Sequence, residues 1–324
     1  MSGLGQALDG NEVGRLGLGC FFYGSSARED SMRTIRGALE LGVNLLDTSD
    51  AYAAGENEVL VGEAIAGRRH SAFVITKFGW VLDSSGNPIR LDGSGAHVRR
   101  SCEASLERLG TDYIDLYIAH RIDPSVPIEE TAGELSRLID EGKIRAMGLS
   151  EAGVATVERA HSAGPLGALQ TEYSLWSREP ETEVIPLCRR LGVAFIAYSP
   201  LGRGFLTGRI RAESDLEASD FRRGHPRFQT ENLSRNLPLA SSLRDLGAEL
   251  GHTPAQLALA WLLSRPGRVY AIPGTRRLEH VRENLDAMTV RLTAAELDAV
   301  GDAVPPALVH GQRHPPGHMQ TIGR

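Results

Sequence analysis

Eight short apolar runs, separated by longer amphipathic stretches, constrain the fold of this chain more than any other feature of its sequence. Short runs rich in β-branched and other apolar residues are typical of parallel strands that are covered on both faces. We assign these runs to residues 15–18, 43–47, 73–76, 113–118, 146–149, 168–170, 194–197 and 269–272. Repeated β-α units indicate an α/β protein, and eight of them fit a closed (β/α)8 TIM barrel. An open doubly wound sheet is the alternative.

The stretches between the runs have helical spacing. Met32, Ile35 and Leu39 repeat at intervals of three and four residues, as the buried face of a helix does. No Gly-x-Gly-x-x-Gly follows the first run and no P-loop occurs, so both common signatures of nucleotide binding in open sheets are missing. The closed barrel is therefore the preferred prediction.

The domain organisation follows from the spacing of the runs. Residues 1–324 are expected to form one barrel domain. The connection at residues 201–236 is unusually long, and a connection of that length is usually functional or disordered. Helical spacing resumes over residues 237–250. Residues 306–324 contain two adjacent prolines and are expected to form an irregular tail near the mouth of the barrel.

Composition argues against several classes of protein. The formal net charge of −6 gives no support for a nucleic-acid or membrane partner. The three cysteines are widely spaced, so neither a disulfide framework nor a structural zinc site is predicted. His310, His314 and His318 are four residues apart, but the prolines between the last two interrupt any helix, and we predict no metal site. Without a signal peptide or an apolar membrane span, the protein is expected to be cytoplasmic.

Ionisable residues stand at the carboxyl ends of three neighbouring predicted strands. Asp47 ends the second strand, Lys77 follows the third, and His120 lies just beyond the fourth. Tyr52 comes shortly after Asp47, in the loop that follows the second strand. Because these strand ends converge on one face of a barrel, the four side chains are expected to meet there.

These four side chains suit acid–base chemistry at a carbonyl group. A tyrosine with its usual pKa of about 10 is a poor acid at neutral pH unless a nearby cation stabilises its phenolate. Lys77 can supply that charge, Asp47 can hold the ammonium group, and His120 can orient a carbonyl oxygen. Taken singly, each has a structural alternative, such as an ion pair for Asp47 and Lys77 or a core aromatic for Tyr52.

Seven blocks of sequence resemble motifs of the aldo-keto reductase family, in order between residues 13 and 304. The blocks are residues 42–48, 75–79, 113–121, 142–150, 169–174, 198–202 and 272–275. The sequences Gly-Leu-Ser-Glu at 148–151 and Pro-Gly-Thr-Arg at 273–276 resemble a bacterial-type branch of the family. The resemblance implies a barrel that reduces aldehydes or ketones with NADPH. It places the family's catalytic tetrad on Asp47, Tyr52, Lys77 and His120, with Tyr52 as the proton donor.

The resemblance also implies a site for NADP(H) across the barrel mouth, without a Rossmann domain. Ser150 and Gln170 would hold the carboxamide, and the Tyr198 ring would stack on the nicotinamide. The long connection at 201–236 would lie on the cofactor side and cradle the pyrophosphate. Two arginines before a predicted helix would bind the 2′-phosphate. The implied cofactor set is Gly19, Cys20, Ser150, Gln170, Tyr198, Ser199, Leu201, Gly204, Leu206, Gly274, Thr275, Arg276, Arg277, His280, Glu283 and Asn284.

Four positions depart from the family's pattern. Ala53 replaces the Gly that commonly follows the tyrosine, and Glu151 stands where many relatives have Asn. Gly274 and His280 replace a Lys and an Arg, so the preference for NADP over NAD rests on the two arginines after Thr275.

Aromatic residues are predicted to line the substrate mouth, where the small-molecule aldehyde or ketone would bind. They are Phe21, Phe22, Tyr23, Trp80 and Trp176. Two other functions are open. A regulatory subunit resembling channel-associated relatives of the family would bind the nucleotide with little turnover. A Schiff-base aldolase would use Lys77 as its nucleophile, although an adjacent carboxylate that keeps the lysine charged disfavours that chemistry.

Overall fold

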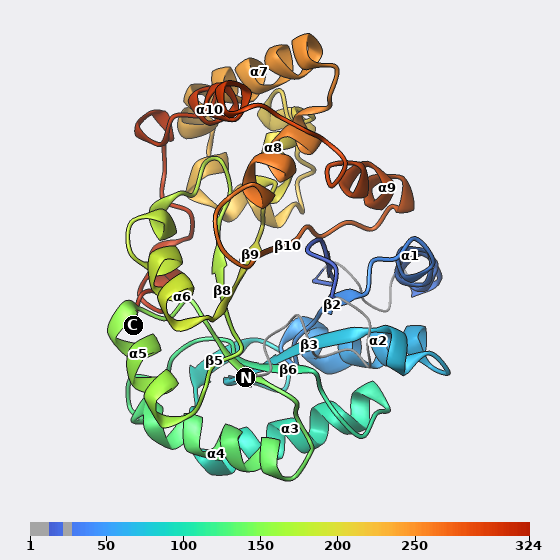
Figure 1. Cartoon of the computed structure of the whole chain (residues 1–324), viewed down its shortest axis with the longest axis vertical. Coiled ribbons are helices and arrows are strands. Elements are labelled where there is room, and N and C mark those ends of the chain that lie inside the picture. Colours follow the sequence, from blue (N-terminus) through green and yellow to red (C-terminus); the bar gives the residue numbers. More distant parts are fainter. Residues whose placement is uncertain (1–12, 22–27) are drawn as a thin grey trace.

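The computed structural model describes residues 13–21 and 28–324. Within them, eight parallel strands with helices between them form a (β/α)8 barrel, which confirms the predicted fold (Figure 1). In order around the barrel the strands are β1 (Leu18–Gly19), β2 (Leu45–Asp47), β3 (Phe73–Phe78), β6 (Leu116–Ala119), β7 (Met147–Ser150), β8 (Ala168–Glu172), β9 (Ala194–Tyr198) and β10 (Val269–Ile272).

The first and last strands of the barrel meet. Leu16 forms a parallel bridge with Ala271, just before β1. The Gly17 amide donates to the Ala271 carbonyl at 2.8 Å, and the Ala271 amide donates to the Arg15 carbonyl at 2.9 Å. These bonds join the two ends of the sheet and remove its open edges.

Alternate residues of the strands fill two hydrophobic clusters. Leu45, Phe73 and Ile75 belong to the smaller cluster, which lies inside the barrel. Their neighbours Leu46 and Val74 point the other way and pack in the larger cluster between strands and helices. Because both faces of the strands are buried, residues of either face are apolar and the strands read as continuous apolar runs in the sequence.

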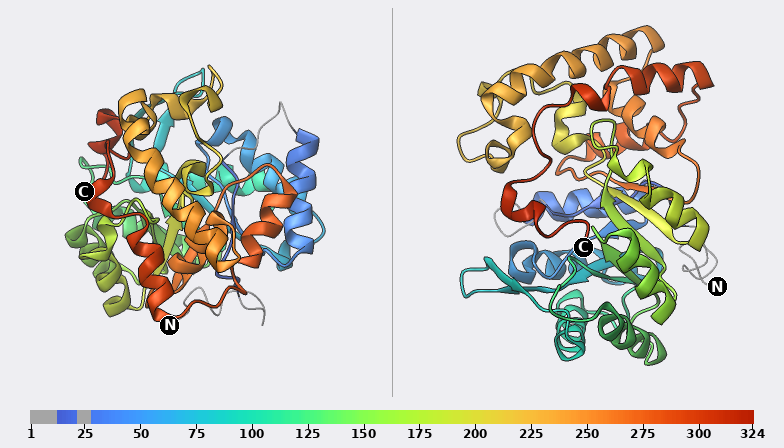
Figure 2. Two further views of the ribbon diagram at one scale, coloured as in Figure 1. Left: turned by 90° about the horizontal axis from the view of Figure 1, so that it is seen from above. Right: turned by 90° about the vertical axis from the view of Figure 1, so that its left-hand side faces the viewer.

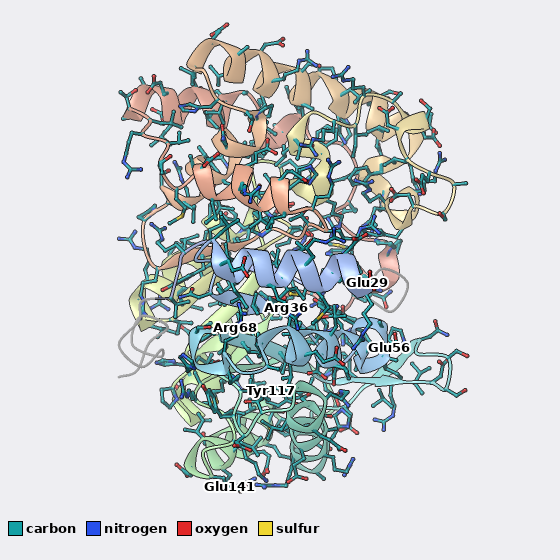
Figure 3. All side chains as sticks on the ribbon, turned by 90° about the vertical axis from the view of Figure 1, so that its right-hand side faces the viewer. Glu29, Arg36, Glu56, Arg68, Tyr117 and Glu141 are labelled. Atoms are coloured by element: carbon teal, nitrogen blue, oxygen red, sulfur yellow. The ribbon has the colours of Figure 1, made fainter. Side chains whose placement is uncertain are left out.

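Helices surround the barrel (Figures 1 and 2). They are α1 (Arg28–Glu40), α2 (Glu56–Ile65), α3 (Gly95–Leu109), α4 (Ile128–Asp140), α5 (Val154–Ala163), α6 (Val184–Leu191), α7 (Thr230–Leu250), α8 (Pro254–Leu263), α9 (Leu278–Asp286), α10 (Ala294–Asp302) and α11 (Pro316–Met319). Their outer faces carry charged side chains, such as Glu29 and Arg36 on α1 and Glu56 on α2 (Figure 3). None of the described helices is long and apolar enough to cross a membrane.

Helix α7 begins earlier than the sequence predicts. It starts at Thr230 rather than at residue 237, so the connection after β9 ends at residue 229. The extra turns are held by a tertiary contact: Asn236 is buried, accepts the His310 amide at 2.8 Å and donates to the His310 carbonyl at 3.0 Å. The rest of the connection forms short 3-10 helices at Gly202–Thr207 (η6), Glu213–Asp215 (η7), Phe221–Gly224 (η8) and Pro226–Phe228 (η9).

Two further segments differ from the sequence-based elements. A hairpin of β4 (Trp80–Leu82) and β5 (Pro88–Leu91) follows β3 and is not predicted from the sequence. The tail, for which the sequence predicts irregular structure, contains η10 (Pro306–Leu308) and α11. The end of the tail lies beside α5 (Figure 1), where the Gly153 amide donates to the Arg324 carbonyl at 2.7 Å.

Candidate active site

The four residues of the predicted tetrad lie together at the carboxyl ends of β2, β3 and β6. Lys77 Nζ donates to Asp47 Oδ1 at 2.6 Å, to the Thr48 carbonyl at 2.7 Å and to the Tyr52 hydroxyl at 3.3 Å. The rings of Tyr52 and His120 meet edge to face, with 5.8 Å between their centroids. The barrel therefore brings a phenol, an ammonium group, a carboxylate and an imidazole to one place.

Lys77 is fully buried and keeps its charge. Burial alone would lower the pKa of this lysine, but the Asp47 carboxylate and the Tyr52 hydroxyl together outweigh that effect and hold the pKa of Lys77 above its usual value. The other oxygen of Asp47 accepts from Gln170 Nε2 at 2.7 Å. Because a nucleophilic lysine must lose its proton, this pairing argues against the Schiff-base aldolase.

Tyr52 keeps its proton at neutral pH. Burial raises the pKa of Tyr52 above 10, and the Lys77 ammonium opposes this shift without cancelling it. The hydroxyl is therefore present as a proton donor. Lys77 lies where it can stabilise the phenolate that remains after the proton has left.

His120 is neutral, and Ser49 contacts its ring. Burial, together with the charges of Arg121 and Lys77, holds the pKa of His120 well below its usual range. Ser49 Oγ lies 3.1 Å from His120 Nδ1 and 3.3 Å from Asp50 Oδ1. Sequence reasoning did not single out Ser49, whose only signal was its place in the loop between two tetrad residues.

Several of the predicted cofactor residues lie at or near the carboxyl ends of strands, as the tetrad residues do. Ser150 and Tyr198 are the last residues of β7 and β9, and Gly19 ends β1. Gln170 lies two residues before the end of β8. Cys20 follows Gly19, but its backbone groups are used within the protein. The Cys20 amide donates to the Asp47 carbonyl at 2.8 Å, and the Cys20 carbonyl accepts from Asn57 at 2.6 Å.

The predicted pyrophosphate loop contains four residues with left-handed backbone, which are Ser199, Gly202, Arg203 and Gly204. Ser199 has φ 49° and Gly204 has φ 89°. The segment between them, which includes Leu201, leads into η6, and Leu206 is buried at its end. A Cβ at Gly202 would lie 2.5 Å from the Trp176 indole nitrogen, so the chain passes this ring too closely for any other residue.

The residues predicted for the adenosine end gather at the start of α9. Gly274 and Thr275 follow β10, and Arg276 and Arg277 are exposed just before the helix. Asn284 is buried on the helix itself.

Arg209 joins this group although sequence reasoning did not select it. Its guanidinium lies 3.3 Å from the Glu283 carboxylate and contacts His280 Nε2. The other ring nitrogen of His280 is 3.1 Å from Thr275 Oγ1. The expected cofactor role of the long connection was the signal that could have found Arg209.

The predicted substrate residues divide into two groups. Phe21 is 51% exposed and packs against the Tyr52 ring, with 5.1 Å between centroids. Trp80 opens β4, directly after the strand that carries Lys77. Phe22 and Tyr23 lie outside the described residues.

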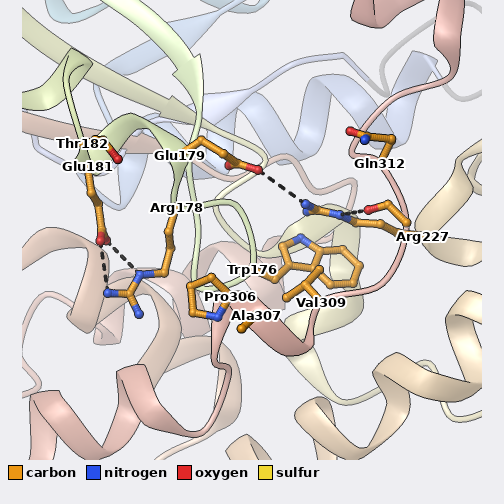
Figure 4. A pocket seen from close by; sticks show the side chains of 11 residues that line it. Trp176, Arg178, Glu179, Glu181, Thr182, Arg227, Pro306, Ala307, Val309 and Gln312 are labelled. Atoms are coloured by element: carbon orange, nitrogen blue, oxygen red, sulfur yellow. Dashed lines mark hydrogen bonds and ion pairs between the residues drawn. The ribbon is translucent and has the colours of Figure 1, made fainter.

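Trp176 packs in the interior, where it is 1% exposed. Its ring stacks on Phe205 with 4.3 Å between centroids. It also forms one wall of a cavity of about 850 Å³, which Arg227, Glu179 and Val309 help to line and which no tetrad residue lines (Figure 4). These surroundings differ from the substrate mouth that the sequence predicts for Trp176.

Comparison with known proteins assigns the family. Residues 15–304 match the model of the Aldo/keto reductase family. The chain is 43% identical over 312 residues to probable aldo-keto reductase 1 of Glycine max. The match covers 94% of this chain and 89% of that protein. The chain therefore belongs to the aldo/keto reductase family.

Solved structures share the fold over most of their length. A glycerol dehydrogenase from Gluconobacter oxydans has a TM-score of 0.84 and 31% identity, with 92% of this chain and 94% of that chain covered. An aldo/keto reductase from Klebsiella pneumoniae, solved in complex with NADP and acetate, has a TM-score of 0.75 and 28% identity. The match covers 96% of this chain and 98% of that one.

Proposed function

We propose that this chain is an NADPH-dependent oxidoreductase that reduces aldehydes or ketones to alcohols, reversibly, with Tyr52 as the proton donor. One observation carries the proposal: the Tyr52 hydroxyl lies 3.3 Å from a buried ammonium group, which the Asp47 carboxylate holds at 2.6 Å. Membership of the family supports it, as does the relative from Klebsiella pneumoniae whose structure contains NADP. The alternative is a regulatory subunit that binds the nucleotide with little turnover.

The strand ends beside the tetrad fit a nicotinamide nucleotide, which would supply the hydride. Gln170 gives its Nε2 to Asp47, so its Oε1 is the group that can accept an N–H from a carboxamide. Ser150 Oγ and the Tyr198 ring lie at the neighbouring strand ends. Arg276 is exposed before α9 and has no ion-pair partner among the described residues. Its guanidinium group can therefore bind the 2′-phosphate of NADPH.

Side chains of the tetrad stabilise the negative charge that develops on the carbonyl oxygen. Tyr52 passes its phenolic proton to that oxygen, and Lys77 stabilises the phenolate left behind. His120 orients the oxygen by a hydrogen bond and, being neutral, does not compete as the acid. In the oxidation of an alcohol the same groups act in reverse.

The variant Tyr52→Phe tests the proposal. Removing the hydroxyl removes the proton donor, so we expect kcat for NADPH oxidation with nitrobenzaldehyde to fall by about 10²- to 10⁴-fold. The dissociation constant for NADPH should change little, because the ring and its packing remain. Tyr113→Phe is the matched control: its ring packs against Arg69 and Arg145 before β6, and kcat should be unchanged.

The same assays separate the alternatives. Turnover at the wild-type rate in Tyr52→Phe would remove Tyr52 from the mechanism. Nucleotide binding by the unmodified chain without turnover of any carbonyl would favour the regulatory subunit. With NADPH and NADH in parallel, we expect Arg276→Met to raise the KM for NADPH by about tenfold and to leave the KM for NADH unchanged.

A further inference from the structure

A buried cluster of ionisable side chains joins the tail to the ends of β7, β8 and β9. Glu151 and Glu172 follow or end strands, Arg203 lies in η6, and Arg313 and His314 come from the tail. Their side chains are at most 11% exposed. Charged and polar groups buried to this degree are costly unless they are paired, and each of these has a partner from a distant part of the chain.

Glu151 is the centre of the cluster. Arg313 donates to both of its carboxylate oxygens, each at 2.8 Å. The Tyr198 hydroxyl donates to Glu151 Oε1 at 2.8 Å, and the Glu172 amide donates to the same oxygen at 2.9 Å. Although burial would raise the pKa of Glu151, the contact with Arg313 holds it below its usual value, so the carboxylate is charged.

His314 reaches the same hydroxyl from the tail. Its Nε2 lies 3.2 Å from the Tyr198 hydroxyl and 3.1 Å from Glu172 Oε2. Arg203 donates to both oxygens of Glu172, at 3.1 and 2.8 Å. The cluster therefore touches Tyr198 and, through Arg203, the loop that precedes Gly204.

We propose that the tail is a working part of the nicotinamide site, in which Arg313 and His314 hold the Tyr198 ring in place through its hydroxyl. The proposal rests on the function proposed above and on the stacking of the Tyr198 ring on the nicotinamide that the family resemblance implies. Rotation about the Cα–Cβ bond of Tyr198 would swing its hydroxyl away from its partners, and the contacts with Glu151 and His314 at that hydroxyl restrict this rotation. Glu151, Arg313 and His314 are then positioning residues.

The path of the tail supports this role. The Gly323 amide donates to the Glu151 carbonyl at 2.8 Å, so the tail is held both at its end and at Arg313. Glu151 has left-handed backbone, with φ 55°, which is unfavourable for a residue other than glycine. A Glu at this position, where many relatives have Asn, therefore has a defined role, because its single carboxylate anchors both the tail and the Tyr198 hydroxyl.

A double-mutant cycle on nucleotide binding tests the proposal. Tyr198→Phe removes the hydroxyl alone, and Arg313→Met removes the charge while keeping most of the side-chain length. We expect each variant to raise the dissociation constant for NADPH on the order of tenfold, measured by fluorescence titration without a carbonyl substrate. Because both act through one hydroxyl, the double variant should be weakened little more than either single variant.

Control variants distinguish a role of the tail in positioning the Tyr198 ring from a role in stabilising the fold alone. Arg159→Met removes an exposed arginine that donates to both oxygens of Glu129, and it should leave the NADPH affinity unchanged. Arg313→Lys keeps the charge and should restore part of the affinity lost in Arg313→Met. If Arg313→Met does not fold, Glu151→Gln, which keeps the shape of the side chain, takes its place in the cycle.

Three results would overturn the proposal. These are an unchanged NADPH affinity in Arg313→Met, even with a loss of thermal stability, additive losses in the double variant, or an unchanged NADPH affinity in Tyr198→Phe. Failure of the proposed function is distinguishable, because it would appear as NADPH binding without turnover in the unmodified chain. Absence of NADPH binding by the unmodified chain would overturn both.

Discussion

The loop after the proposed proton donor shows how a single residue can depart from a family pattern at a cost. Ala53 and Ala54 both have left-handed backbone, with φ 49° and 51°. Glycine adopts this conformation without strain, and many relatives have glycine at the first position. Both alanines are exposed, so their side chains need no space in the packed interior. The departure therefore adds local strain beside Tyr52 without moving it from Lys77.

Asp50 is an acidic residue whose pKa lies near neutral pH. Burial, followed by the nearby Glu58 carboxylate, raises its pKa from 3.8 to about 7, although Arg108 opposes the shift. Between these two values the folded state holds a proton that the unfolded state has released. The contribution of Asp50 to stability therefore falls as the pH rises from about 4 to about 7.

We expect Asp50→Asn to remove this loss. The free energy of unfolding should rise by about 1 to 3 kcal/mol at pH 8 and change little at pH 4, as urea unfolding at the two pH values would show. Asp245→Asn, at a position where the side chain is 68% exposed, is the control and should show no such difference between the two pH values. Equal effects of Asp50→Asn at both values would contradict the expectation.

At the scale of elements, close approach of backbones decides how α2 and α3 pack. A Cβ at Gly62 of α2 would lie 2.3 Å from the Leu109 carbonyl oxygen at the end of α3. We expect Gly62→Ala to push the helices apart and to lower the free energy of unfolding by about 2 to 3 kcal/mol in urea.

Gly133 is the matched control for this substitution. It lies inside α4, and a Cβ there would meet no atom within 4 Å. Gly133→Ala should therefore stabilise the protein by about 1 kcal/mol, because alanine favours the helix. The same sign for both substitutions would show that helix propensity, and not the contact between α2 and α3, governs position 62.

At the scale of the whole molecule, stability depends on closing the barrel between its first and last strands. Arg15 contributes from outside β1: its Nε donates to the Val269 carbonyl at 3.0 Å and its Nη2 to the Leu263 carbonyl at 2.7 Å. We expect Arg15→Met to cost about 2 kcal/mol and to speed hydrogen exchange at the Ala271 amide, while the amides of β6 keep their protection. A uniform loss of protection would instead indicate that the barrel opens as one unit.

The order of the strands and helices and the position of the tetrad could be predicted from local patterns in the sequence. Short continuous apolar runs and stretches with helical spacing predict the order of strands and helices, because each element needs apolar surface to bury. Asp47, Lys77 and His120 could be placed because the carboxyl ends of successive parallel strands must meet at one face. The ordered motifs then identified the family, which the comparisons confirm.

The rest depends on contacts between residues far apart in the chain, for which no local period exists. Ser49 and His120, Asn236 and His310, and Arg313 with Glu151 are pairs of this kind. Local preference also fails for short exposed elements such as the hairpin of β4 and β5, which bury too little apolar surface to leave a pattern. Burial turns such pairs into strong contacts, and burial is a property of the folded chain alone.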